Sequence, residues 1–308
     1  MIDLKNIEGF YFVGIGGIGM SALALYFRQG NFEIAGYDRT GSGITQTLTD
    51  EGCMVSYEDD INTIPPLFRN IHKKDRVIVV FTPAISAENR IISFFRDNDY
   101  RLYKRSEILG AISLNTDTLA IAGTHGKTTV STMTAHLLKQ SHVDCSAFLG
   151  GISKNYNTNL LTGNSRFTVI EADEFDRSFH RLSPLMAVVT SADADHLDIY
   201  GDRVEMIKAY NEFTARIRKG GSLFINDRIR DVIKAPEGIN VFTYGSSSGS
   251  DYSYSRIRHI SDYYKFDLNT PAGIMTDLHF PFPGIVNIEN LTAAIAVALN
   301  CGVEEDEI

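Results

Sequence analysis

The amino-acid sequence predicts an α/β protein of two domains, each built on a parallel β-sheet. Three observations indicate this fold class. Short apolar runs alternate with helical segments along the chain, two glycine-rich turns each join a strand to a helix, and the 308 residues are about twice the length of a typical domain. We expect a Rossmann-like domain over residues 1–112, followed by a second α/β domain over residues 113–308.

The expected first domain alternates strands with helices. Strands are predicted at residues 10–13, 32–37 and 77–81, and helices at residues 20–29, 44–51 and 88–97. Residues 77–81 form a nearly continuous apolar run, which is typical of a parallel strand covered on both faces. This order favours a doubly wound parallel sheet.

The expected second domain repeats the alternation. Strands are predicted at residues 119–122, 167–172, 187–190 and 222–225, and helices at residues 128–139, 204–218 and 290–299. Residues 245–250 (GSSSGS) have the composition of a flexible loop. Residues 252–267 then alternate apolar and polar side chains, which predicts an antiparallel hairpin or meander.

Composition and charge exclude several classes of protein. The 29 Lys and Arg residues against 38 Asp and Glu residues leave a net charge of −9, which argues against a nucleic acid partner. No apolar run reaches the ~18 residues of a membrane-spanning helix, so we expect no membrane partner. The cysteines Cys53, Cys145 and Cys301 are far apart and odd in number, which predicts a reduced, cytoplasmic protein. The oligomeric state is left open.

The first glycine-rich turn, residues 14–19 (GIGGIG), fits the pattern G-x-G-x-x-G between a strand and a helix. Its glycines are Gly14, Gly16, Gly17 and Gly19. They permit a tight turn that brings backbone amides close to a diphosphate at the positive end of the helix. Asp38 follows at the end of the second strand, where an acid can bind a ribose hydroxyl. The motif predicts a bound diphosphate and leaves open whether it belongs to NAD or to another nucleotide.

The second glycine-rich turn, residues 123–129 (GTHGKTT), also lies between a strand and a helix. A nucleoside-triphosphate loop needs a backbone cradle, a lysine that reaches the β- and γ-phosphates, and a hydroxyl for Mg²⁺. Lys127 and Thr128 match the last two parts, although Gly123 is only three residues before Gly126 and the standard motif is longer. The second domain is therefore predicted to be a P-loop-type ATP-binding domain, which a plain dehydrogenase would not need.

Acidic side chains follow two strands of this domain. Residues 171–176 (EADEFD) end one strand, and residues 193–198 (DADHLD) follow the next. Ligands of open α/β sheets bind at this carboxyl edge, and carboxylates suit Mg²⁺, a hard ion that takes oxygen ligands. We expect the first segment to bind Mg²⁺, and His196, which lies among three aspartates, to be a ligand or a catalytic residue.

Five strings, taken in order, resemble the Mur ligase family. They are GIGGIGMSALA at residues 14–24, AGTHGKTT at 122–129, EADEFDRSF at 171–179, DADHLDIYGD at 193–202, and the N-x-x-N pair Asn287 and Asn290. The glycine string is weak by itself, whereas the other four are specific. Together they cover nearly the whole chain.

The resemblance implies an ATP-dependent enzyme that forms an amide bond. Within the family, the strings are most similar to those of members that join L-alanine to the lactyl carboxylate of UDP-N-acetylmuramate in peptidoglycan precursor synthesis. In such enzymes the carboxylate attacks the γ-phosphate, and the amine then attacks the resulting acyl phosphate. The implied cofactors are ATP and Mg²⁺.

The resemblance also implies site residues. Lys127 would contact the β- and γ-phosphates, Thr128 and Glu171 would hold one Mg²⁺, and His196 would hold a second; Lys127, Glu171 and His196 are the expected catalytic residues. Nucleotide contacts are expected from Gly123, Thr124, His125, Gly126, Lys127, Thr128, Thr129, Asn287 and Asn290, with Asn290 also capping the last helix. UDP-sugar contacts are expected from Gly14, Gly16, Gly17, Gly19, Ser21, Asp38, Thr82, Pro83 and Ala84.

Three positions need separate mention. Some relatives carry a carbamylated lysine at the metal site, and Lys208 is the one candidate nearby, although a surface lysine is the simpler interpretation. Ser191 stands where relatives often have asparagine, and Ile285 stands where they often have arginine.

Family members carry a third domain that closes over ATP, whereas this chain ends at Ile308. We therefore expect a two-domain part of a longer protein that does not complete the reaction by itself. Three alternatives stay open: a dehydrogenase that binds NAD at residues 14–19, a murein-peptide recycling ligase of the same superfamily, and a catalytically silent nucleotide-binding module.

Overall fold

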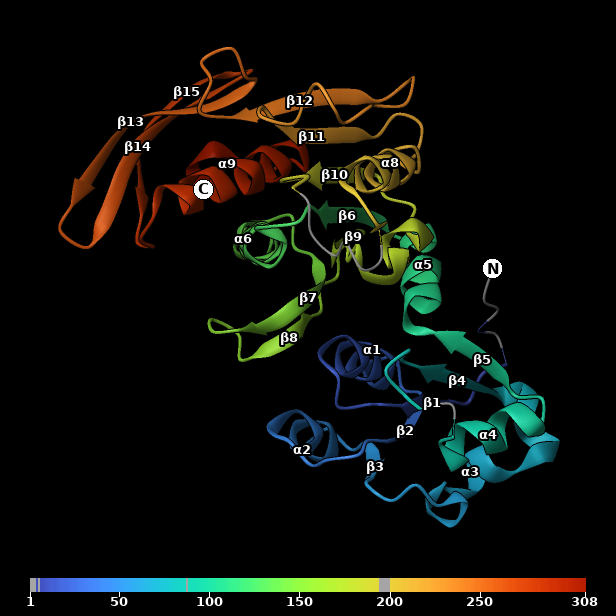
Figure 1. Ribbon diagram of the computed structural model, residues 1–308. Helices are drawn as coiled ribbons and strands as arrows, with labels where there is room; N and C mark the ends of the chain where they lie inside the picture. Colours follow the sequence, from blue (N-terminus) through green and yellow to red (C-terminus); the bar gives the residue numbers. More distant parts are fainter. Residues whose placement is uncertain (1–3, 5, 87, 194–199) are drawn as a thin grey trace. The chain divides into compact units, whose positions relative to one another are not determined.

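The computed structural model describes residue 4 and residues 6–86, 88–193 and 200–308. The chain forms two compact units (Figure 1). The first comprises Met1–Ile112 together with Gly150–Leu160, and the second comprises Ser113–Leu149 together with Leu161–Ile308. The sequence prediction had placed residues 150–160 in the second domain. The predicted α/β class with parallel sheets is confirmed.

The first unit is built on a five-stranded sheet in the order β3-β2-β1-β4-β5, and all its neighbouring strands are parallel. The strands are β1 (Gly9–Val13), β2 (Glu33–Tyr37), β3 (Met54–Ser56), β4 (Val77–Phe81) and β5 (Arg101–Lys104). The helices are α1 (Ile18–Gln29), α2 (Gly43–Asp50), α3 (Pro66–Arg69), α4 (Arg90–Asp97) and α5 (Arg105–Asn115), with the 3₁₀ turns η1 (Ile61–Thr63) and η2 (Ile71–Arg76). The strand order reverses between β1 and β4, which is where ligands of doubly wound sheets bind.

The core of the first unit lies on both faces of β1 and β4. Every residue of β1 is buried, as are the first four of β4. The Tyr11 ring on β1 packs against Phe68, at 5.5 Å between centroids, and against Phe95, at 4.9 Å. Burial of these aromatic side chains fixes the sheet that presents the glycine-rich turn.

The second unit is built on a ten-stranded mixed sheet in the order β15-β14-β13-β12-β11-β10-β6-β9-β7-β8, although the end of β7 and most of β8 fall in the segment Gly150–Leu160 that belongs to the first unit. The strands are β6 (Asp117–Ala122), β7 (Ser146–Ser153), β8 (Thr158–Leu161), β9 (Phe167–Glu171), β10 (Met186–Val189), β11 (Ser222–Asn226), β12 (Asn240–Gly245), β13 (Tyr252–Ile260), β14 (Tyr263–Thr270) and β15 (Gly273–Phe280). The helices are α6 (Lys127–Gln140), α8 (Arg203–Thr214) and α9 (Ile285–Asn300), with the 3₁₀ turns η3 (Phe175–Arg181) and η4 (Glu305–Glu307).

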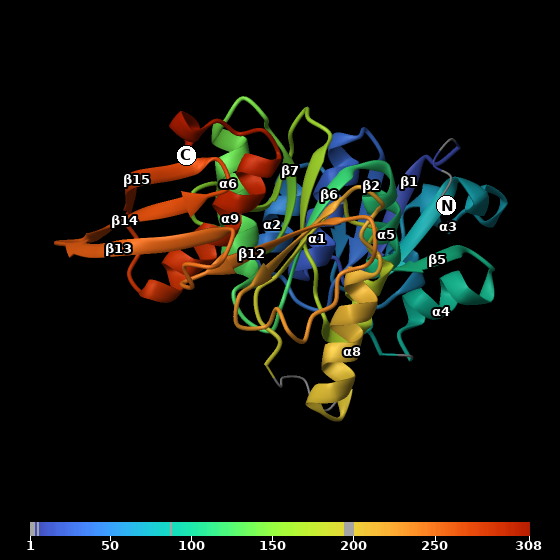
Figure 2. The ribbon, with the colours of Figure 1, turned by 90° about the horizontal axis from the view of Figure 1, so that it is seen from above.

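The central strands from β12 to β7 run parallel, so their carboxyl ends meet at one edge of the sheet. Strands β13, β14 and β15 form an antiparallel meander, which Figure 2 shows as three strands side by side. The hairpin or meander predicted from residues 252–267 is thus confirmed. Helices α6 and α9 pack against each other on the sheet.

Two helix boundaries differ from the predictions. The last helix begins at Ile285 and not at residue 290, with Gly284 as its N-cap, so the expectation that Asn290 caps this helix is wrong. Helix α8 ends at Thr214 and not at residue 218, because the chain tightens into i→i−3 turns such as Arg216 N to Phe213 O. Strands β3, β5, β7, β8, β12 and β15 and helices α3 and α5 were not predicted. Among the described helices, none is long and apolar enough to cross a bilayer.

We predict that Phe95→Ala destabilises the first unit by about 3–5 kcal/mol, because it removes a fully buried ring and leaves a cavity beside Tyr11. Ile71→Ala is the control, since Ile71 is 46% exposed, and should cost less than about 1 kcal/mol. Because the chain has no tryptophan, far-UV circular dichroism in urea is the measurement. Equal losses for the two variants would contradict this description of the core.

Candidate functional site: two glycine-rich turns and a nucleotide cavity

The first candidate site lies where β1 passes into α1. Gly14 has a φ of 90°, a left-handed conformation that favours glycine, and a methyl group on Gly16 would lie 2.9 Å from Asp38 Oδ2. The Gly16 N–H donates to Asp38 Oδ2 at 2.7 Å, and the Thr40 N–H approaches Asp38 Oδ1 at 3.4 Å. Asp38 therefore ties the glycine-rich turn to the end of β2.

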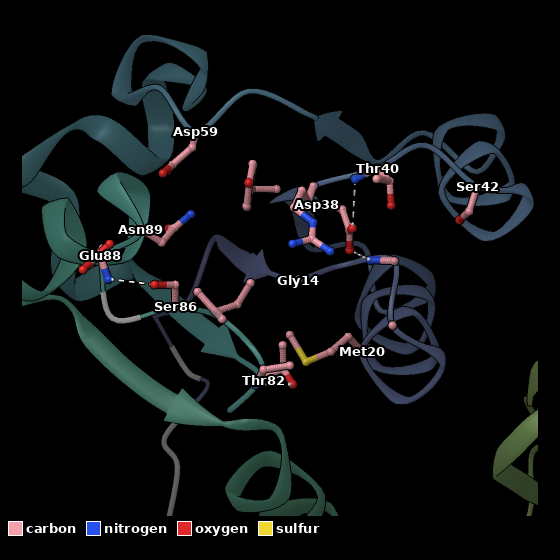
Figure 3. A pocket seen from close by; sticks show the side chains of 16 residues that line it. Gly14, Met20, Asp38, Thr40, Ser42, Asp59, Thr82, Ser86, Glu88 and Asn89 are labelled. Atoms are coloured by element: carbon pink, nitrogen blue, oxygen red, sulfur yellow. Dashed lines mark hydrogen bonds between the residues drawn. The ribbon is translucent and has the colours of Figure 1, made fainter.

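A cavity of about 730 Å³ opens in front of this turn. It is lined by Gly14, Gly16, Gly17, Met20, Tyr37, Asp38, Arg39, Thr40, Ser42, Asp59, Thr82, Ala84, Ile85, Ser86, Glu88 and Asn89. In Figure 3, Asp38 and Thr40 lie on one side of the cavity, and Asp59, Ser86 and Asn89 lie on the other. Its polar groups are mostly hydroxyls, amides and carboxylates, which suit a ligand rich in hydroxyl and amide groups.

Six of the nine residues that were expected to contact a UDP-sugar line this cavity, whereas Gly19, Ser21 and Pro83 do not. Ser21 is buried, donates to Ile18 O at 2.9 Å and accepts from Asn159 Nδ2 at 3.0 Å. Gly19 lies against the Arg105 side chain, which a methyl group on Gly19 would displace. Ser21 therefore lies on the buried side of α1, in contact with Asn159.

Asp59 and Asn89 line the opposite wall, and sequence reasoning missed both. The Asp59 carboxylate accepts from the Arg90 and Ile91 N–H groups at 3.0 and 3.1 Å, and Asn89 Oδ1 accepts from Ile92 N at 3.0 Å. Asn89 precedes a helical segment, where asparagine is a common N-cap, so its place could have been predicted. The place of Asp59 could not, because its partner Arg90 is 31 residues away. Burial raises the pKa of Tyr37 on the cavity floor, with Asp59 and Asp38 adding to the shift, so its hydroxyl stays neutral.

The second candidate site is the turn between β6 and α6. Gly123 and Gly126 have φ values of 134° and 83°, which favour glycine. Gly126 is the N-cap of α6, and the first backbone bond of the helix runs from Val130 N to Gly126 O at 2.8 Å. The amides of residues 127–129 therefore precede the helical bonding pattern and point out of the positive helix end, the arrangement that binds phosphate.

Lys127 reaches back over this turn. Its Nζ donates to Gly123 O at 2.8 Å and to Glu174 Oε1 at 2.7 Å. The Glu174 side chain is only 1% exposed, and the Tyr200 hydroxyl donates to its backbone O at 2.5 Å. A buried carboxylate thus holds the lysine that the sequence assigned to the phosphates. Glu174 lies in the predicted acidic segment, but no role was assigned to it.

Thr128 and Glu171 meet, as the resemblance implied. The Thr128 hydroxyl donates to Glu171 Oε1 at 2.9 Å, and the Ser131 hydroxyl approaches Glu171 Oε2 at 3.4 Å. These oxygen donors fit Mg²⁺. Across the described residues, no three His, Cys, Asp or Glu side chains gather to bind a metal by themselves, so phosphate oxygens and water would complete its coordination.

Two other residues, His196 and Lys208, were expected near the metal. His196 lies outside the described residues. Lys208 lies on α8 with 62% of its side chain exposed, and its Nζ is 3.5 Å from Glu205 Oε2.

The strand next to β6 anchors the phosphate loop. The Thr190 hydroxyl donates to His125 O at 2.5 Å, and the His125 N–H donates to Ser191 Oγ at 2.8 Å. The Ser191 and Thr124 hydroxyls are 2.8 Å apart. Ser191 therefore fixes the loop through side-chain and backbone contacts. Two signals pointed to this position in the sequence: it follows β10, beside the strand that leads into the loop, and relatives often carry asparagine there.

A cavity of about 420 Å³ extends from the loop across the carboxyl ends of β10, β11 and β12. It is lined by His125, Gly126, Thr129, Thr190, Ser191, Asp193, Asn226, Arg228, Ile229, Tyr244, Val286, Asn287, Glu289 and Asn290. The expected pair Asn287 and Asn290 thus faces the same cavity as the loop. A methyl group on Gly126 would lie 2.8 Å from Asn290 Oδ1, so loop and helix α9 are in close contact.

Comparison with known proteins agrees with this geometry. The model of the Mur ligase family, catalytic domain, matches residues 9–116, and the model of the Mur ligase middle domain matches residues 121–298. The chain belongs to the Mur ligase family. This Mur ligase carries both glycine-rich turns within the matched segments.

Curated relatives are similar over the full chain. A UDP-N-acetylmuramate–L-alanine ligase of Phocaeicola vulgatus is 43% identical over 308 residues, which are 100% of this chain and 66% of the relative. One of Porphyromonas gingivalis is 46% identical over 300 residues, which are 97% of this chain and 65% of the relative. This Mur ligase thus spans about two thirds of the length of the relatives it matches.

Two solved structures share the fold. A UDP-N-acetylmuramate:L-alanyl-γ-D-glutamyl-meso-diaminopimelate ligase of Neisseria meningitides has a TM-score of 0.84 at 21% identity, covering 96% of this chain and 94% of that one. A UDP-N-acetylmuramate-alanine ligase of Thermotoga maritima has a TM-score of 0.79 at 24% identity, covering 97% of this chain and 66% of that one.

We predict that Gly126→Ala weakens nucleoside-triphosphate binding roughly tenfold. The added methyl group displaces the Asn290 amide, and a tenfold change corresponds to the loss of about one polar contact. Gly220→Ala is the matched control: Gly220 has a φ of 81° and open space around a Cβ position. Both variants should lose about 1–2 kcal/mol of stability from the left-handed backbone. Titration calorimetry measures the difference, and equal binding by both variants would refute the role of this contact.

Proposed function

We propose that this Mur ligase takes part in joining L-alanine to the lactyl carboxylate of UDP-N-acetylmuramate, with ATP as the activating substrate. The single observation that carries the proposal is the phosphate loop of residues 123–129, in which Lys127 and the Thr128–Glu171 pair converge at the N-terminus of α6. The choice of substrates is supported by the names of the curated relatives, at 43% and 46% identity.

The proposed chemistry follows from the low reactivity of a carboxylate towards an amine. One carboxylate oxygen attacks the γ-phosphorus of ATP, the bond to the bridging oxygen breaks, and ADP leaves. The amine nitrogen of L-alanine then attacks the acyl carbon, phosphate leaves with its oxygen, and the amine loses a proton. The protein supplies position and charge and no covalent nucleophile.

In this proposal the loop amides bind the phosphate oxygens, and Lys127 changes partners. Its ammonium lies 2.7 Å from Glu174 Oε1 and also donates to Gly123 O. A β- or γ-phosphate oxygen offers a stronger partner than the Gly123 carbonyl, so we expect Lys127 Nζ to swing towards the phosphates. Glu174 then keeps the lysine aimed at the loop, and Ser191 holds the loop in the binding conformation.

Thr128 and Glu171 are the proposed holders of Mg²⁺. When bound, Mg²⁺ neutralises the negative charge that builds up on the phosphate oxygens. The two residues orient each other, since the Thr128 hydroxyl donates to Glu171 Oε1 at 2.9 Å. His196 stays a proposed ligand of a second site on the ground of the family pattern.

The cavity of the first unit is the proposed UDP-sugar site. The turn of residues 14–19 would bind the diphosphate, and Asp38, Thr82 and Ala84 would contact the nucleoside. Asp38 Oδ2 is engaged by Gly16 N at 2.7 Å, whereas Oδ1 has only the long contact from Thr40 N at 3.4 Å, so Oδ1 is the oxygen better placed to accept from a ribose hydroxyl. Both proposed sites use the same device, a helix N-terminus at the carboxyl edge of a parallel sheet.

We expect the chain to bind UDP-N-acetylmuramate and ATP·Mg²⁺, each at one site, and not to bind NADH. The reason is that a triphosphate loop has no use in a dehydrogenase. Titration calorimetry with the three ligands in turn is the test. Saturable binding of NADH without binding of UDP-N-acetylmuramate would overturn the proposal.

Lys127→Ala should lower L-alanine-dependent phosphate release by on the order of 100-fold or more, since removal of one positioned charge from a transferring phosphoryl group costs about 3 kcal/mol. The assay uses a chain extended to the length of the curated relatives. His142→Ala is the control, because His142 Nδ1 pairs with Glu307 Oε2 at 2.9 Å outside the cavity and should leave the rate unchanged. A Lys127→Ala enzyme with parental turnover would exclude the assigned role.

A further inference from the structure

One ion pair lines the cavity of about 420 Å³ beside the phosphate loop and has no part in the chemistry proposed for that loop. Arg228 follows β11 and Glu289 lies on α9, and both line the cavity. Arg228 Nη2 contacts Glu289 Oε2. The Glu289 side chain is 9% exposed, whereas the Arg228 side chain is 68% exposed. A buried carboxylate therefore holds one edge of an accessible guanidinium.

The partners of Glu289 make Arg228 its main counter-charge. Glu289 Oε1 is buried and forms no hydrogen bond with any described residue, so the Arg228 contact is the bond that its carboxylate makes. A buried charge with a single cationic partner holds that partner firmly, because separating the two leaves the carboxylate uncompensated. On the other side, the Arg228 N–H donates to Asn226 Oδ1 at 3.1 Å, which fixes the backbone.

The position of Arg228 in the sheet separates it from the phosphates. The phosphate loop follows β6, β10 lies between, and Arg228 follows β11. Neighbouring strands lie about 4.8 Å apart, so Arg228 is roughly 10 Å along the sheet edge from the loop. The cavity that begins at residues 126–129 is also lined by Arg228, so it has room there for the nucleoside of a triphosphate held at the loop.

The surroundings of Arg228 suit an aromatic ring. Tyr244 is buried beside it and hydrogen-bonded to the Asn226 side chain, and burial raises the pKa of Tyr244 far above its usual value, so its hydroxyl is neutral. Ile229 adds an apolar side chain to the same wall. A guanidinium that is tied along one edge keeps both its planar faces free, and these faces stack on nucleobases.

We propose that Arg228, held in place by Glu289, stacks on the base of the bound ATP and so recognises the nucleoside and not the phosphates. Arg228 is the contact residue, and Glu289 is a positioning residue. This inference rests on the proposed function of the phosphate loop, because the loop sets where the base lies. Arg228 lies outside the motifs of the sequence analysis, and Glu289 is an unassigned position between Asn287 and Asn290.

The test compares two ligands by titration calorimetry with the 308-residue chain. ATP·Mg²⁺ carries the base, and inorganic tripolyphosphate·Mg²⁺ carries the phosphates alone. Arg228→Ala should weaken ATP binding roughly tenfold, the effect typical of losing one base-stacking side chain, and leave tripolyphosphate binding unchanged. Arg230→Ala is the matched control, because Arg230 lies two residues further on, is 54% exposed, and pairs with Asp231 outside the cavity. It should change neither affinity.

Further variants separate stacking from charge. Arg228→Lys keeps the charge and loses the planar group, so its ATP affinity should stay as weak as that of Arg228→Ala. Glu289→Gln keeps the shape of the side chain and should weaken ATP binding in the parental chain. In the Arg228→Ala background the same change should weaken ATP binding by less than about twofold, because the effects of two coupled residues are not additive. Circular dichroism checks that each variant is folded.

The outcomes are distinct. Unchanged ATP binding by Arg228→Ala, an equal loss for tripolyphosphate, or full rescue by Arg228→Lys would overturn this inference while leaving the proposed function in place. Additive effects of Glu289→Gln and Arg228→Ala would overturn the positioning role. A parental chain that binds neither ATP nor tripolyphosphate would instead contradict the proposed function itself.

Discussion

Both candidate sites depend on one constraint. At the carboxyl edge of a parallel sheet, the chain must turn from the end of a strand into the start of a helix. The turn at that point is short, and its first helical amides have no acceptor within the helix. Gly14 and Gly126, with φ values of 90° and 83°, allow the chain to make these turns. The strands that precede the two turns, β1 and β6, are almost wholly buried, which fixes the turns in space. The amides of residues 127–129 are then placed to bind anions.

At two places in the second unit, a buried glutamate positions the side chain of a cationic residue. Glu174, at 1% exposure, holds Lys127 over the phosphate loop, and Glu289, at 9% exposure, holds Arg228 two strands away. Breaking a buried pair by removing one partner costs about 3–5 kcal/mol, a figure that suits Lys127 and Glu174. The pair of Arg228 and Glu289 is worth less, because water reaches the guanidinium, but it still orients that group. An orientation fixed in advance lowers the entropy that ligand binding would otherwise cost.

The parts of the fold that local sequence determines could be predicted. The glycine-rich turns, the apolar strands beside them and the meander near residues 252–267 follow from spacing and periodicity. The contacts of Ser191 with His125, of Glu174 with Lys127 and of Glu289 with Arg228 join residues 66, 47 and 61 positions apart. No local pattern encodes such pairs. Asn290 was wrongly expected at a helix start because Gly284 supplied the N-cap.

The most direct test of this account is a crystal structure of the chain with a non-hydrolysable ATP analogue and Mg²⁺. The account predicts phosphate oxygens on the amides of residues 127–129, with Mg²⁺ beside Thr128 and Glu171. It also predicts that Lys127 Nζ leaves Gly123 O, now 2.8 Å away, for a β- or γ-phosphate oxygen. A nucleotide bound instead at residues 14–19, with Lys127 still on Gly123 and Glu174, would contradict it.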